Sequence, residues 1–114
     1  MNRTEAGENL GRSRYNNTSN NSIFSPEAGE QWFIELLKCT NVTTSVVKVR
    51  VFVDPDGTTY SEDTAEYYDT PIQPGQTLEL AINYPLYSSA GNVAVYNSVA
   101  NSVNFRLFGY EITK

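Results

Sequence analysis

The sequence of 114 residues contains no histidine, a single cysteine and few charged residues for its length. Without histidine, neither a Ser-His-Asp triad nor a Cys-His pair can form, and a zinc site built from Cys and His ligands is excluded as well. Cys39 has no partner for a disulfide within the chain. Charged residues make up 18% of the chain, below the usual share of about 25%. These shortages predict a protein that is not an enzyme and that holds no metal or cofactor.

Long apolar runs are also missing. No stretch approaches the roughly 20 apolar residues of a membrane span, and the first thirty residues contain no apolar core like that of a signal peptide. The net charge of −5 argues against nucleic acid as the main ligand, because nucleic acid usually binds a basic face. We therefore expect one compact domain whose partner is neither nucleic acid nor a membrane.

The chain divides near residue 22. Residues 1–22 carry three arginines against two glutamates, which gives +1, and the remaining five basic and eleven acidic groups give residues 23–114 a charge of −6. The polar run at 16–22 cannot bury enough surface to order itself, so residues 1–22 are predicted to be a flexible N-terminal arm. The arm is either a disordered tail or a segment that orders on a neighbouring subunit. Its candidate contacts are Arg3, Arg12, Arg14 and Tyr15.

Residues 23–114 show a period of two, which is typical of strands. Strands are predicted over 45–53, 77–82, 93–96 and 103–112, and a bulge is predicted at Gly109. Residues 31–39 fit either a helix that begins at Ser25 or a strand, and the strand is favoured because Gly29 would lie inside the helix. The residues predicted to be buried are Val47, Val49, Val51, Val53, Leu78, Leu80, Ile82, Val95, Phe105 and Leu107. The pattern predicts an all-β fold, an antiparallel β-sandwich of jelly-roll type over residues 23–114.

Two features allow other functions. The acidic stretch from Asp54 to Asp69 offers oxygen ligands for calcium, but it lacks the EF-hand spacing, and a solvated loop explains it as well. Its carboxylates also permit a glycosidase, for which 114 residues leave little room. Seven of the eight tyrosines lie between Tyr60 and Tyr110, where they either cap core edges or form a sugar-binding surface.

Apolar residues also stand at positions that the alternation assigns to the outer faces of the strands. They are Phe33, Leu37, Val46, Phe52 and Phe108. Because exposed apolar patches mark association surfaces, we expect a self-associating subunit. Its candidate interface consists of Phe33, Leu37, Phe52 and Phe108.

Five short segments carry a resemblance to a known class of proteins. They are PEAGEQW (26–32), KCTN (38–41), VDPDGTTY (53–60), PGQTL (74–78) and FRLFGYE (105–111). In this succession, residues 23–114 resemble the small β-sandwich virion proteins of tailed bacteriophages, and most of all the capsid decoration, or cement, proteins. The resemblance does not extend to residues 1–22.

The resemblance implies a structural virion protein on the capsid surface, a homotrimer that binds the major capsid protein or another virion protein. Neck, tail and head-fibre subunits use similar sandwiches, so they remain alternatives, as does a carbohydrate-binding adsorption module. The resemblance brings no catalytic motif with it.

Overall fold

The computed structural model describes the backbone of residues 2–3 and 8–113 and the side chains of residues 13–112. In this part of the chain the elements are β1 (Asn2–Arg3), β2 (Glu8–Ser13), β3 (Asn21–Phe24), β4 (Gln31–Asn41), β5 (Val47–Asp54), the short 3-10 helix η1 (Glu62–Thr64), β6 (Ala65–Ile72), β7 (Thr77–Leu86), β8 (Asn92–Asn97) and β9 (Val103–Thr113). No helix within these ranges has the length and hydrophobicity needed to cross a membrane. The predicted all-β class is confirmed.

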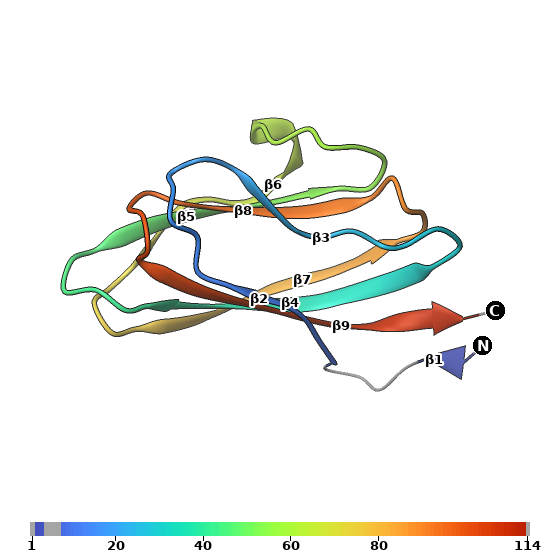
Figure 1. The fold of residues 1–114 in the computed structure, drawn as a ribbon, viewed down its shortest axis with the longest axis horizontal. Coiled ribbons are helices and arrows are strands. Elements are labelled where there is room, and N and C mark those ends of the chain that lie inside the picture. Colours follow the sequence, from blue (N-terminus) through green and yellow to red (C-terminus); the bar gives the residue numbers. More distant parts are fainter. Residues whose placement is uncertain (1, 4–7, 114) are drawn as a thin grey trace.

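The strands form two antiparallel sheets that lie face to face (Figure 1). The first sheet has the order β1-β9-β4-β7, and β2 also pairs with β9; the second has the order β3-β8-β5-β6. The pairs are nested in sequence, because β2 pairs with β9, β3 with β8, β4 with β7 and β5 with β6. The β-sandwich is therefore confirmed. The jelly-roll type stays a prediction, with which this nesting agrees.

The core lies between the two sheets and follows the period of two. Along β5, Val47, Val49 and Val51 are fully buried, because a strand sends alternate side chains to one face. Nine of the ten residues predicted to be buried are so, and Leu78 is half-buried against the same cluster. Glycine at a positive φ closes the predicted turn before β7: Gly75 has φ +73°, and Gln76 N–H donates to the Gln73 carbonyl at 3.0 Å.

Strand β4 settles the ambiguity over residues 31–39, since it runs without a break from Gln31 to Asn41. Its pairing with β9 shifts between Ile34 and Leu36, which leaves Glu35 as an extra residue on β4. The predicted bulge at Gly109 is therefore misplaced. Strand β9 keeps its alternation and buries Gly109, and the extra residue lies in the strand opposite.

Residues 8–24 lie along both sheets in this arrangement. Glu8–Ser13 pairs with β9, and Asn21–Phe24 pairs with β8 in the other sheet. Tyr15, between these two strands, packs against the buried cluster. The boundary at residue 22 and the flexibility of the preceding segment stay predictions. What the backbone shows is that both sheets receive strand pairing from before residue 23.

Candidate interaction surface

The outer face of β4 and β9 is divided into an apolar half and a polar half. Successive cross-strand pairs on this face are Phe33 with Tyr110, Leu36 with Phe108, Lys38 with Arg106, and Thr40 with Asn104. The first two pairs form the outer aromatic patch, which we define as Phe33, Leu36, Phe108 and Tyr110. All four side chains are half-buried. Among the described residues the only helix, η1, lies over the opposite sheet and leaves this face without a helical cover (Figure 1).

Ring contacts hold the outer aromatic patch in place. Phe33 and Tyr110 stack with their ring centroids 5.4 Å apart and their planes at 28°. The Lys38 ammonium lies 5.8 Å from the centroid of Phe108 and also pairs with Glu79 at 3.3 Å. Stacked aromatic pairs contribute about 0.5–1.5 kcal/mol beyond the area that they bury. The patch is thus a preformed surface.

The prediction that Leu37 lies on an outer face is wrong. The extra residue Glu35 reverses the alternation of β4, so that Leu36 points outward and Leu37 is fully buried between the sheets. A period of two carries no sign of such a bulge, because the bulge arises from the pairing of β4 with its neighbours. Leu36 therefore takes the outer position that the alternation assigned to Leu37.

The prediction of an exposed Phe52 is also wrong. Its ring is 1% exposed, and the Tyr60 ring lies 5.9 Å away, centroid to centroid. Tyr60 belongs to the segment between β5 and β6, and its hydroxyl donates to the Asn92 side-chain oxygen at 2.7 Å. This segment covers the outer side of β5, so Phe52 has no exposed surface to offer a partner. Of the predicted interface, Phe33 and Phe108 remain on an outer face, and their contact with a partner stays a prediction.

The predicted arm contacts lie at different places. The backbone of Arg3 is opposite Ile112, and that of Arg12 is opposite Arg106, while both side chains lie outside the described residues. Tyr15 turns toward the core, with its ring 6.1 Å from Phe105. Arg14 is exposed.

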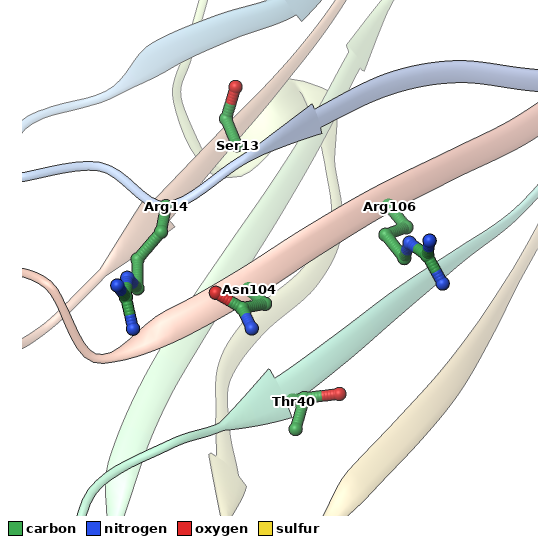
Figure 2. A pocket seen from close by; sticks show the side chains of 5 residues that line it. All are labelled: Ser13, Arg14, Thr40, Asn104 and Arg106. Atoms are coloured by element: carbon green, nitrogen blue, oxygen red, sulfur yellow. The ribbon is translucent and has the colours of Figure 1, made fainter.

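Arg14 contributes to an open recess at the polar half of the outer face (Figure 2). We call it the basic recess; it is lined by Ser13, Arg14, Thr40, Asn104 and Arg106 and encloses about 530 Å³. The Thr40 hydroxyl is held by a hydrogen bond of 2.8 Å to the Thr77 hydroxyl. Within the described part of the chain, no salt bridge reaches either arginine. The alternation of β9 was the available signal for this face, since it places Asn104, Arg106 and Phe108 on one side.

The tyrosines do not gather on one surface. Tyr68 and Tyr96 lie on the second sheet and enclose the Arg50 guanidinium at 4.1 and 4.7 Å from their ring centroids. The same guanidinium pairs with Asp69 at 2.7 Å, which lowers the pKa of that carboxyl. Tyr110 belongs to the first sheet. This arrangement provides one cation with two aromatic faces, and a sugar-binding surface formed by the tyrosines stays a prediction.

Asp54, the first residue of the acidic stretch, binds the backbone of the loop that follows β5. Asp54 is buried, and its carboxylate accepts hydrogen bonds from the backbone N–H groups of Thr59 at 2.8 Å and Asp56 at 3.1 Å. These bonds hold the pKa of Asp54 below its ordinary value. Asp69 faces Arg50, as described above. In the residues that the structure covers, no three His, Cys, Asp or Glu side chains are grouped to hold a metal.

Comparisons with known proteins assign the chain to no family. No protein-family model matches the chain, and no curated protein matches it. Among solved structures, one similar chain comes from the structure of the infectious bursal disease virus Gx strain, with 10% identity and a TM-score of 0.48. The similarity covers 96% of this chain and 30% of that one. This chain thus spans less than a third of the length of that viral chain.

Proposed function

We propose that this chain is a non-enzymatic structural protein of a virion, a decoration protein that binds and stabilises a bacteriophage capsid. Two things support the proposal: the resemblance of residues 23–114 to small virion sandwiches, and the β-sandwich itself. The observation that carries it is the outer aromatic patch, because an apolar sheet face without a helical cover is typical of a subunit that associates.

The outer aromatic patch serves self-association in this proposal. Phe33 and Phe108 lie on adjacent cross-strand pairs, and symmetric contact between copies would remove both rings from water. The proposed assembly is a homotrimer on the capsid surface. A trimer that touches several shell subunits at once stabilises the shell by mass action, because it binds the assembled shell and not the separated subunits.

Two variants test the assembly. Phe108→Glu places a charge within the patch, whereas Val46→Glu places the same charge at an exposed position just before β5. Light scattering should give the wild type and Val46→Glu three times the chain mass of 12.7 kDa, and Phe108→Glu a smaller mass. Circular dichroism of both variants checks that the sandwich is folded.

Co-sedimentation tests the virion role. Purified undecorated capsids should carry the wild-type protein into the pellet, and decorated capsids should withstand a higher temperature than bare ones. Purified tails and necks serve as the second arm, because a subunit of those structures would sediment with them instead. A wild-type protein that is monomeric and sediments with none of these assemblies would refute the proposal.

A further inference from the structure

We propose that the basic recess binds carboxylates of an acidic polypeptide segment on the shell, an inference that rests on the proposed function and deepens it. The recess would then be the part of the outer face that selects the partner by charge, next to a patch that associates through apolar contact.

The first argument is the distribution of ion pairs. The chain has thirteen acidic and eight basic residues, so acids are available in excess. Lys38 nevertheless pairs with Glu79, and Arg50 pairs with Asp69. Among the described residues, the cations without a salt bridge are Lys48 on the second sheet and the two arginines Arg14 and Arg106. The two arginines left unpaired both line one recess. A bound segment with its own carboxylates would form ion pairs with both arginines.

The second argument is the geometry of the recess. Figure 2 shows the guanidinium groups of Arg14 and Arg106 on either side of the Asn104 side chain, without converging on one point. Two separated cations suit two carboxylates on an extended chain better than one compact multivalent anion. The Asn104 amide and the Thr40 hydroxyl lie between or beside them and provide neutral groups for the backbone of such a chain.

The third argument is the register of β2 against β9. Arg12 is the direct partner of Arg106 in this pairing, so the strands place two positively charged residues at one level of the sheet. A polyanion as dense as nucleic acid is disfavoured by the net charge of −5, whereas a short acidic segment needs only the local charge of the recess.

The test uses the full chain and a fluorescein-labelled hexaglutamate peptide, with labelled hexaglutamine as the neutral probe. Fluorescence anisotropy at low ionic strength should show binding of hexaglutamate and no binding of hexaglutamine. Added salt should weaken the binding of hexaglutamate. Arg106→Gln and Arg14→Gln should each raise the Kd by about tenfold, which corresponds to about 1.4 kcal/mol. Lys48→Gln, which removes one charge from an exposed position on the other sheet, should leave the Kd within a factor of two or so of the wild type.

Four results would overturn the inference. Two of them are no binding of hexaglutamate and an equal loss of hexaglutamate affinity in Arg106→Gln and Lys48→Gln. The other two are tighter binding of an oligothymidine than of hexaglutamate and a smaller light-scattering mass for Arg106→Gln. The last result would make the recess part of the contact between copies. Co-sedimentation separates this inference from the proposed function. If Arg106→Gln still attaches fully to capsids, the recess is not the contact with the shell, and the proposed function is unaffected. If the wild type binds hexaglutamate but no virion assembly, the proposed function is refuted.

Discussion

Replacement of Phe52 by alanine tests the position of this ring in the fold. The side chain is 1% exposed and is covered by Tyr60, whose hydroxyl is anchored to Asn92. Removing a buried phenylalanine side chain costs about 3–5 kcal/mol, from the lost transfer energy and the cavity that remains. Because a small domain has a total stability of about 5–15 kcal/mol, the loss should be large but measurable.

Urea unfolding at low protein concentration, followed by Trp32 fluorescence, measures this loss. Phe52→Leu is a milder substitution, with an expected loss in free energy of unfolding below about 1.5 kcal/mol. This variant can still be measured if the alanine variant does not fold. Phe33→Ala is the matched control, since Phe33 is half-buried on the other sheet and should lose less stability than Phe52→Ala. A Phe52→Ala protein with wild-type unfolding and an altered light-scattering mass would refute the reasoning, because Phe52 would then lie at a contact between subunits.

Three further predictions concern single residues. Hydrogen bonds to backbone N–H groups lower the pKa of Asp54, so its contribution to stability is complete above the ordinary pKa and is lost as the pH falls through the lowered one. The stability deficit of Asp54→Asn, measured by urea unfolding, should therefore be largest at neutral pH and should shrink as the pH falls below the ordinary pKa of an aspartate; a deficit that does not change with pH would contradict this reasoning. Gly75→Ala should cost about 1–2 kcal/mol, because φ is +73° there while an added Cβ would meet no atom within 4 Å; an unchanged melting temperature would count against this. Burial raises the pKa of the Cys39 thiol to about 12, so Ellman's reagent should react with it only after denaturation, and rapid reaction of the folded protein would place the thiol at the surface.

The residues of the candidate interaction surface were only partly predictable. Phe33 and Phe108 could be found from the alternation, and Arg14 from the charge of the N-terminal segment. Arg106 and Asn104 were not identified, because their significance depends on Arg14, which lies far away in the sequence and reaches the same recess only through the pairing of β2 with β9. A strand pattern does not specify which strands become neighbours.

The sequence by itself determined the class of fold and most of the core. Alternating valines from Val47 to Val53 can satisfy a buried face only as a strand, and a glycine such as Gly75 permits the turn that joins two strands. The tertiary structure decided which apolar residues remain outside. The extra residue at Glu35 buries Leu37 and turns Leu36 to the outer face, and the segment that contains Tyr60 covers Phe52. Both outcomes depend on strand register and on cover by a distant segment. A local period of two indicates only the side of the strand to which each side chain points. It therefore specifies neither the strand register nor the distant segment that covers a side chain.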